Sequence, residues 1–208
     1  VCHSDLHIID EGTVGNHVFT LGHENAGWIE EVGDTVKDYK KGDAVLVYGP
    51  WGCGHCKPCQ QSKENYCDHQ SELGYGGGLG LNGGMADYML VPSSRLLVPI
   101  FDLDPVIAAP LTDAALTPYS AIKRSLPKLM PDEYVVVIGV GGLGHVAIQI
   151  LREISGATII ACDVTEDKLA FAKELGAAYT VNSKDADAAE RILKITGIKK
   201  AKVILDFV

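Results

Sequence analysis

The stretch Tyr134–Gly144, which reads YVVVIGVGGLG, decides the fold that this chain is expected to adopt. Its first half predicts a short apolar strand, and the apolar spacing after the glycines predicts a helix. Gly139 would form the tight turn, Gly141 would let the backbone approach a pyrophosphate, and Gly144 would let helix and strand pack closely. The phosphate charge would lie at the helix N-terminus. The stretch therefore predicts a dinucleotide-binding strand–turn–helix unit, with Gly142 among its cofactor-binding residues.

An acidic residue at the end of the next predicted strand supports this interpretation. Asp163 lies nineteen residues beyond Gly144. Its carboxylate would accept hydrogen bonds from both ribose hydroxyls and would repel a 2′-phosphate, which favours NAD over NADP. The alternative is that Asp163 only forms a turn after the strand. The spacing favours the cofactor role.

From residue 133 onward the chain alternates between short apolar runs and amphipathic segments. Alternation of mostly apolar strands with helices predicts a parallel sheet covered by helices. The expected strands are 134–138, 158–162, 179–181 and 203–207, and the expected helices are 112–124, 143–154, 166–175 and 186–195.

Residues 1–110 are expected to be β-rich instead. Short apolar runs at 28–32, 44–47 and 86–91 are separated by Gly-Asp or Gly-Gly pairs, which predicts short strands and tight turns. The segment Gly74–Gly84 contains seven glycines. We interpret it as a flexible or tightly turning connection without a nucleotide role, because no strand leads into it and no helix follows.

A cysteine array lies within this β-rich region. Its spacing is C-x2-C-x2-C-x7-C, formed by Cys53, Cys56, Cys59 and Cys67. Four thiolates on a tight loop can enclose zinc tetrahedrally with no open position, which is typical of a structural site. Gly52 and Gly54 would let the backbone turn closely around the metal.

Disulfides and an iron–sulfur cluster are the alternatives for this array. Disulfides are disfavoured because nothing indicates secretion, and dense C-x-x-C spacing indicates a metal. The long step to Cys67, with no proline after it, disfavours the cluster. Cys162 lies in an apolar run and is interpreted as an inert core thiol.

Two further segments carry metal-ligating and proton-handling groups. Residues 1–7 read VCHSDLH, and residues 21–24 read LGHE. Zinc binds thiolate and neutral imidazole readily, and a catalytic zinc keeps three protein ligands and one open position. Either segment alone would be explained by scattered polar residues. Together with the cysteine array and the glycine stretch, they predict a catalytic zinc site.

Composition narrows the class of protein. The chain has 208 residues, 47% of them hydrophobic, and a formal charge of 18 − 27 = −9. It has no basic run, which argues against nucleic acid or an anionic membrane as a partner. Its longest apolar region is broken by glycines and a histidine, so we expect no membrane span. Metal-type cysteines and the lack of a targeting segment favour a cytoplasmic location.

The motifs CHSDLH, GHE, GCGHCKPC, PLTDAALTPY and GVGGLG, in this order, resemble those of the zinc-containing alcohol dehydrogenases of the medium-chain dehydrogenase/reductase superfamily. The resemblance covers nearly all of the chain. It implies an N-terminally truncated GroES-like catalytic domain over 1–116 and a C-terminally truncated Rossmann domain over 117–208, with the first half of its sheet plus the fourth strand. The start at Val1 without methionine also suggests an interior fragment.

The resemblance also implies a set of catalytic zinc ligands. Cys2 and His23 match two of them. The segment PLTD resembles a bacterial subgroup in which aspartate, here Asp113, is the third ligand, and zinc accepts oxygen ligands. The alternative is that Asp113 caps the helix that follows.

Other site residues follow from the same resemblance. Asp5 resembles the carboxylate that orients the ligating histidine. Glu24 is similar to a glutamate that approaches the metal during ligand exchange, and Ser4 and His7 match a proton relay. Two residues match cofactor contacts, His3 near the pyrophosphate and Thr117 at the nicotinamide ring.

The implied activity is reversible hydride transfer from a zinc-bound primary or secondary alcohol to NAD, giving an aldehyde or ketone. Two zinc ions per chain and NAD are the implied cofactors, a small alcohol or carbonyl compound is the substrate, and the parent protein would be a homodimer or homotetramer. One alternative is a polyol, sugar or aryl-alcohol dehydrogenase of the same superfamily. Another is a non-catalytic, zinc-stabilised nucleotide-binding fragment.

Overall fold

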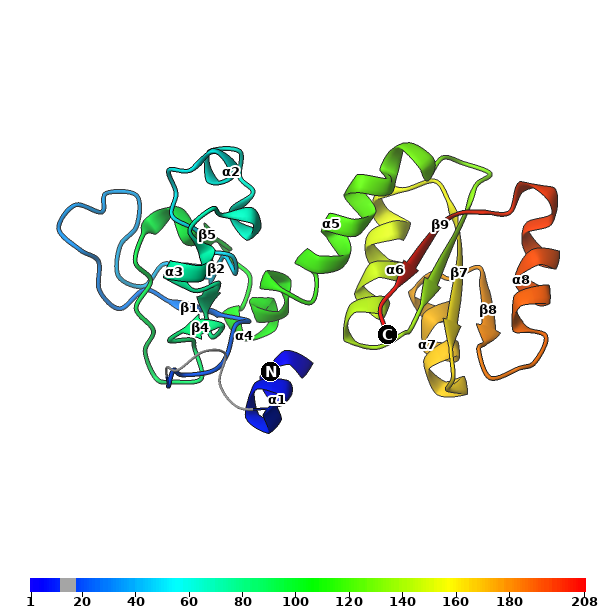
Figure 1. The fold of residues 1–208 in the computed structure, drawn as a ribbon, viewed down its shortest axis with the longest axis horizontal. Helices are drawn as coiled ribbons and strands as arrows, with labels where there is room; N and C mark the ends of the chain where they lie inside the picture. Colours follow the sequence, from blue (N-terminus) through cyan, green and yellow to red (C-terminus); the bar gives the residue numbers. More distant parts are fainter. Residues whose placement is uncertain (12–17) are drawn as a thin grey trace. The chain divides into compact units, whose positions relative to one another are not determined.

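The computed structural model describes residues 1–11 and 18–208. These residues form two compact units, Val1–Asp113 and Ala114–Val208. Figure 1 shows a unit of short strands and loops and a unit in which helices pack on one sheet. We describe each unit by itself.

The second unit is built on a four-stranded parallel sheet in the order β8-β7-β6-β9. Numbered along the chain within this unit, the order is 3-2-1-4, with which the standard dinucleotide-binding sheet begins. The strands are β6 (Tyr134–Ile138), β7 (Thr158–Asp163), β8 (Tyr179–Asn182) and β9 (Ala201–Asp206), and the helices are α5 (Leu116–Ser125), α6 (Gly142–Ile154), α7 (Glu166–Leu175) and α8 (Ala188–Thr196).

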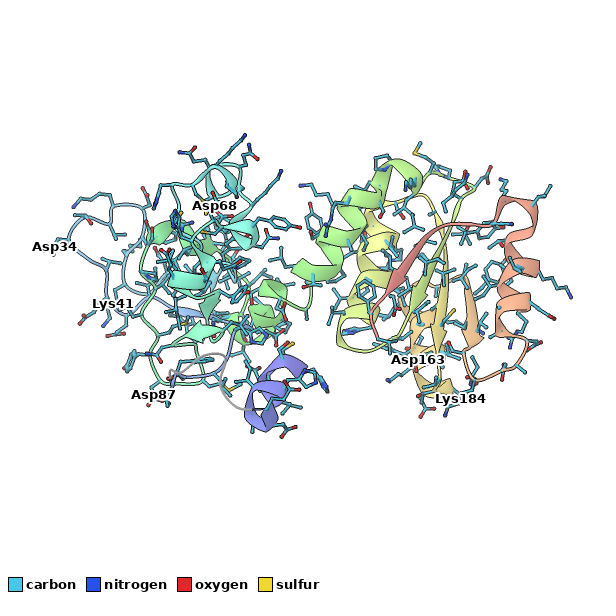
Figure 2. All side chains as sticks on the ribbon, in the orientation of Figure 1. Asp34, Lys41, Asp68, Asp87, Asp163 and Lys184 are labelled. Atoms are coloured by element: carbon cyan, nitrogen blue, oxygen red, sulfur yellow. The ribbon has the colours of Figure 1, made fainter. Side chains whose placement is uncertain are left out.

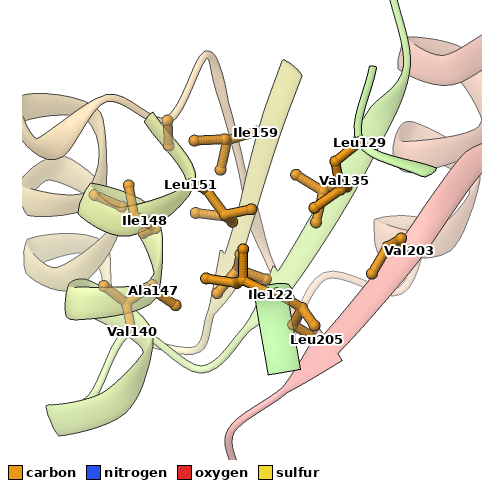
Figure 3. Packing of buried hydrophobic residues seen from close by; sticks show 14 residues of the cluster. Ile122, Leu129, Val135, Val140, Ala147, Ile148, Leu151, Ile159, Val203 and Leu205 are labelled. Carbon is orange, nitrogen blue, oxygen red and sulfur yellow. The ribbon is translucent and has the colours of Figure 1, made fainter. Parts of the chain in front are cut away.

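Helices cover both faces of this sheet because successive strand residues point to opposite sides. Val135 and Val137 of β6 belong to the larger buried cluster, with Ile148 of α6 (Figure 3). Val136, between them, packs on the other face, against a cluster that includes Ile192 of α8. The expected α/β fold with a parallel sheet is confirmed, and the predicted strand and helix bounds agree within two residues except for α5, which begins at Leu116.

The first unit holds a three-stranded antiparallel sheet in the order β1-β2-β5, so its β-rich character is confirmed. Leu46 of β2 packs with Ile100 and Ala108, whereas Val47 packs with Trp51 and Leu96. The strands are β1 (Ala26–Trp28), β2 (Ala44–Val47), β3 (Gly76–Gly77), β4 (Gly80–Leu81) and β5 (Leu97–Pro99), and the helices are α1 (His3–Glu11), α2 (Lys57–Gln60), α3 (Gln70–Leu73) and α4 (Pro105–Ala108).

Two strand predictions in this unit were wrong. The strand expected at 28–32 is β1, which ends at Trp28, although Ile29 still exchanges backbone hydrogen bonds with Gly42 and Asp43. The run at 86–91 forms no strand. Its partly buried Met89 and Val91 pack against the Val47–Trp51 cluster, but no strand in the described ranges 1–11 and 18–208 pairs with this run. Alternating apolar residues indicate that one side of a segment is buried, whereas a strand also needs a hydrogen-bonded partner.

The glycine-rich segment 74–84 is a tightly turning connection, one of the two forms expected for it. It contains the two-residue strands β3 and β4, which pair in parallel. Its last two residues and the following Met85 run along 20–22, with backbone hydrogen bonds from Gly83 to Thr20, from Gly84 to Gly22 and from Met85 to Leu21, at 2.7, 3.0 and 2.9 Å. This contact fixes the backbone immediately before His23. No helix in the described part of the chain is long and apolar enough to cross a membrane.

Candidate active site and zinc sites

The four cysteines of the array converge on one point. Their sulfur atoms lie within 4.8 Å of one another, with 3.9 Å between Cys53 and Cys59 and 3.9 Å between Cys56 and Cys67. A tetrahedral zinc with Zn–S bonds of about 2.3 Å requires sulfur atoms about 3.8 Å apart. All six cysteines carry free thiols, whereas a disulfide would bring two sulfurs to about 2.05 Å. The spacing therefore fits zinc and excludes disulfides in this array.

The backbone of the cysteine loop bends around this point. Gly52 has φ +52°, and a Cβ atom there would lie 2.7 Å from Cys59 Sγ, so only glycine fits. The N–H groups of Cys53 and Cys56 donate to the sulfurs of Cys67 and Cys53 at 3.2 and 3.3 Å. Burial acts to raise the pKa of the Cys53 thiol, but backbone donors at His55 and Cys56 outweigh it and lower the pKa to about 6. Thiolate is the form that binds zinc.

At Cys59, burial is the largest cause that raises the pKa of the thiol to about 12. Contacts with the sulfurs of Cys56, Cys67 and Cys53 add to the rise, and the backbone at Gly54 opposes it. Such a thiol loses its proton only when a cation compensates for the buried negative charge. The four cysteines thus include Cys53, whose thiol ionises easily, and Cys59, whose thiol ionises when a metal ion is bound. This is the behaviour expected of a site that becomes complete when zinc binds.

Arg95 anchors this loop, a role that no sequence motif predicted. Its guanidinium group donates to the carbonyl oxygens of Trp51 and Gly52, at 2.5 and 2.8 Å, and lies 3.5 Å from Glu64 Oε1. The contact spans more than forty residues of chain. Arginine suits this task because its donors form a rigid planar fork.

The predicted catalytic ligands also converge. One ligand atom each from Cys2, His23 and Asp113 lies within 4.8 Å of the others. His23 Nε2 is 3.5 Å from Asp113 Oδ2, and nitrogen and oxygen ligands at about 2.1 Å from a tetrahedral zinc would be about 3.4 Å apart. The residue at the N-cap of α5 is Ala115, two residues beyond Asp113, which favours the ligand role of Asp113 over the capping alternative. This donor set fits zinc.

Asp5 joins the segments that carry two of these ligands. Its side chain is 1% exposed, and it accepts hydrogen bonds from the N–H groups of Cys2 at 2.8 Å and Gly22 at 3.3 Å. Its Oδ1 lies 3.2 Å from His23 Nδ1, although the two are not aligned as a hydrogen bond. A carboxylate behind one ring nitrogen leaves the other nitrogen facing the metal.

The surroundings of His23 favour positive charge. The Asp113 carboxylate contributes most to raising the pKa of His23 to about 9, burial opposes it, and Cys2 and Asp5 add to the rise. The same negative surroundings attract a divalent cation, which replaces the imidazole proton when it binds.

Helix α1, which the sequence analysis did not anticipate, carries the relay candidates. Ser4 and His7 are exposed and lie three residues apart, so they share a side of the helix. Ser4 Oγ is 3.8 Å from Cys2 Sγ, and the rings of His3 and His7 meet edge-to-face with centroids 4.5 Å apart. Glu24 is partly buried beside His23 in sequence, with Oε2 3.4 Å from the Val1 amino group.

In the second unit the glycine turn has the expected geometry. Gly139 has φ +84°, and a Cβ atom on Gly144 would lie 1.7 Å from the Gly139 carbonyl oxygen. Strand β6 and helix α6 thus approach as closely as their backbones permit. An added Cβ at Gly141 or Gly142 would meet no atom within 4 Å, so the turn has an open side at the start of α6. Thr117, the proposed nicotinamide contact, lies exposed in the first turn of α5.

Asp163 ends β7, as Figure 2 shows, and its carboxylate connects to the glycine turn. Oδ2 accepts from the N–H of Val140 at 2.7 Å, and Oδ1 accepts from the N–H groups of Val164 and Thr165 at 2.8 and 3.1 Å. Burial acts to raise the pKa of Asp163, but these donors and Lys168 outweigh it and lower the pKa. Asp163 therefore does form the turn after its strand, and it also holds the glycine turn in place.

Replacing Asp163 with asparagine is expected to destabilise the fold at pH 7, with an effect that disappears in acid. Because the folded protein holds this carboxyl below its ordinary pKa of 3.8, its contribution is present above about pH 4 and is lost as the pH falls through the lower, folded value. Urea unfolding of wild type and Asp163→Asn from pH 7 to pH 3 measures this. Asp187→Asn, at an exposed aspartate without a side-chain capping bond, is the control, and an Asp163→Asn effect independent of pH would contradict the expectation.

Known protein families match both units. The family described as "Alcohol dehydrogenase GroES-like domain" matches residues 1–102, and the one described as "Zinc-binding dehydrogenase" matches residues 142–208. The chain is 43% identical to an NAD-dependent alcohol dehydrogenase of Sulfurisphaera tokodaii, with 99% of this chain and 60% of the relative covered. It thus spans about 60% of the length of this curated relative.

Solved structures support the same family assignment. The alcohol dehydrogenase of Aeropyrum pernix superimposes with a TM-score of 0.89 at 37% identity, covering 100% of this chain and 61% of that one. The D-arabinose dehydrogenase of Sulfolobus solfataricus gives a TM-score of 0.88 at 40% identity, covering 100% and 64%. With the two sets of converging zinc-ligand atoms and the glycine turn on its parallel sheet, these matches show that the chain belongs to the zinc-containing alcohol dehydrogenases of the medium-chain dehydrogenase/reductase superfamily.

Proposed function

We propose that the protein containing this chain is an NAD-dependent alcohol dehydrogenase that interconverts a primary or secondary alcohol with its aldehyde or ketone. The observation that carries the proposal is the convergence of Cys2, His23 and Asp113, with the buried Asp5 behind His23. Three ligands of this kind leave the fourth position of a tetrahedral zinc for substrate, as in other catalytic zinc sites. The NAD-dependent relatives support the choice of cofactor.

Each proposed site residue of the first unit has a distinct role. Cys2, His23 and Asp113 hold the zinc, while Asp5 keeps the His23 ring oriented. Bound zinc supplies Lewis-acid polarisation of the alcohol oxygen, and NAD supplies the hydride acceptor. Ser4 accepts the hydroxyl proton, and His7, one helical turn further along α1, passes it to solvent. Glu24 is proposed to approach the metal when ligands exchange.

Residues of the second unit are proposed to hold the cofactor. The open side of the turn at Gly141 and Gly142 lets the pyrophosphate approach backbone N–H groups at the start of α6. Asp163, whose carboxylate is held at the end of β7 by the N–H of Val140, is proposed to accept from the ribose hydroxyls. Thr117 is proposed to contact the nicotinamide ring, and His3 the pyrophosphate.

A sugar or polyol is the second candidate substrate. The observation in its favour is the 40% identity to the D-arabinose dehydrogenase of Sulfolobus solfataricus. A panel of primary alcohols, secondary alcohols, polyols and aldoses, compared by kcat/KM with NAD, separates the candidates. Preference for aldoses would replace the simple-alcohol assignment without changing the proposed machinery.

Ser4→Ala is expected to lower kcat about 100-fold or more, because positioned proton transfer contributes about 10²–10⁴ to a rate. Its zinc content should stay at that of the wild type, since Ser4 supplies no ligand. NADH formation by the protein that contains this chain measures the rate, and Ser4→Thr, which keeps the hydroxyl, should recover part of it. Ser71→Ala, at an exposed serine of α3 in the same unit, is the control, and unchanged turnover in Ser4→Ala would refute the relay.

For the protein as a whole we propose a cytoplasmic location and a homodimeric or homotetrameric assembly. The free, metal-type cysteines are compatible with a reducing compartment. Light scattering on the purified protein gives the oligomeric state, and a monomer would contradict this proposal.

A further inference from the structure

We propose that His55 and His69 form an outer metal site on the rim of the cysteine loop, sharing the thiolate of Cys53 with the four-cysteine site. One ligand atom from each of these three residues lies within 4.8 Å of the others. The ion that suits two imidazoles and a thiolate is Zn²⁺ or a neighbouring divalent transition metal. This inference goes beyond the alcohol dehydrogenase activity and concerns two histidines that belong to neither of the zinc sites described above.

The loop backbone fixes both histidines next to sulfur ligands. Gly54, with φ +81°, turns the chain between Cys53 and His55. The N–H of His69 donates to Cys67 Sγ at 3.4 Å, just before α3. The two imidazole rings consequently lie with centroids 5.6 Å apart and their planes inclined by 37°. Their placement depends on the cysteine loop and not on packing in a hydrophobic core, since His55 is exposed.

Each ring has one nitrogen next to an oxygen acceptor. His55 Nδ1 is 3.1 Å from the carbonyl oxygen of Cys53, and His69 Nδ1 is 3.6 Å from Glu72 Oε2. An acceptor at Nδ1 favours the tautomer that carries its proton there, which leaves Nε2 as the free donor to a metal. The Cys53 carbonyl oxygen therefore favours the tautomer of His55 that a zinc ligand needs, and the Glu72 carboxylate lies on the corresponding side of the His69 ring.

Cys53 can serve as the third ligand of the outer site while it remains a ligand of the four-cysteine site. Cys53 Sγ is partly exposed, and a thiolate already bound to one zinc keeps lone pairs for a second ion. Ligands of a single tetrahedral zinc lie about 3.3–3.8 Å apart, so the exposed His55 and the partly buried His69 side chains need to close by only about 1 Å. A cation in this outer site would be separated from the four-cysteine site by one shared sulfur.

The test adds Co²⁺ to protein already loaded with zinc and washed free of excess metal. We expect one cobalt per chain beyond the bound zinc, no released zinc, and a thiolate-to-cobalt charge-transfer band. His55→Ala and His69→Ala should each abolish the extra cobalt and the band while retaining the zinc of the four-cysteine site. Elemental analysis counts both metals, and the absorption spectrum identifies the sulfur ligand.

Two control variants make the assignment specific. His145→Ala removes a histidine of α6 and should leave the extra cobalt unchanged. His3→Ala removes one ring of the exposed His3–His7 pair on α1, and loss of the cobalt in that variant would assign the site to α1 and overturn the proposal. No extra cobalt, cobalt bound without the thiolate band, or cobalt that only replaces zinc would each overturn it as well.

Discussion

Replacing Gly144 with alanine is expected to destabilise the second unit by about 3 kcal/mol or more, near the upper end of single-substitution effects. The added Cβ would lie 1.7 Å from the Gly139 carbonyl oxygen and 2.8 Å from its carbon. Both obstacles are backbone atoms, which cannot rotate away as a side chain can, so α6 must separate from β6. That movement opens the cluster around Ile148 and Leu151. Urea unfolding followed by circular dichroism measures the loss.

Gly142→Ala is the matched control for this experiment. It makes the same chemical change two residues earlier in α6, at a position where the new Cβ meets no atom within 4 Å. Its free energy of unfolding should stay within about 0.5 kcal/mol of the wild type. If Gly144→Ala were as stable as Gly142→Ala, the close strand–helix contact would not be what requires glycine at position 144.

Cys59→Ala is expected to reduce bound zinc from two ions per chain to one and to destabilise the first unit by at least about 3 kcal/mol, because the binding energy of a structural zinc is folding energy. Cys59 is buried in α2, and its sulfur forms one corner of the four-thiolate set. The loop that it holds also carries the contacts of Arg95. Elemental analysis after a chelator wash and urea unfolding give the two quantities.

The same measurements on two other cysteine variants separate the zinc sites. Cys2→Ala should also bind one zinc, with a smaller loss of stability, since its partners His23 and Asp113 are held by other contacts. Cys162→Ala should retain both ions, because Cys162 lies in the core of the second unit. Two zinc ions in chelator-washed Cys59→Ala would contradict the structural assignment of the cysteine array.

The sequence predicted the second unit far better than the first, for a physical reason. In β6 and α7 the spacing of the apolar residues follows from the burial of these residues in the core of the unit. Both elements lie at the predicted residues. The strands of the first unit are three or four residues long where they form its antiparallel sheet, so they depend on which segment pairs with which. Residues 86–91 have the alternation of a strand, but no strand in the part of the chain that the structure describes pairs with them. Helix α1 was missed because its many polar residues leave little apolar periodicity to detect.

The residues of the candidate sites also differ in how far the sequence predicted them. Ligand types and spacing were sufficient to propose the four-cysteine array, whereas the Cys2–His23–Asp113 set was implied by the family resemblance. The structure brings the ligand atoms of each set together. Arg95 could not be found, because its partners are backbone carbonyls more than forty residues away. The pairing of His55 with His69 depends on the path of a loop between them, which no local pattern encodes.

The backbone contact between residues 83–85 and 20–22 has a consequence for how the anchoring of His23 can be followed in solution. The amide N–H groups of Gly83, Gly84 and Met85 donate to the carbonyl oxygens of Thr20, Gly22 and Leu21. A hydrogen-bonded amide exchanges its hydrogen with solvent when the local structure opens. Hydrogen exchange at these three amides therefore measures how often the backbone immediately before His23 is released.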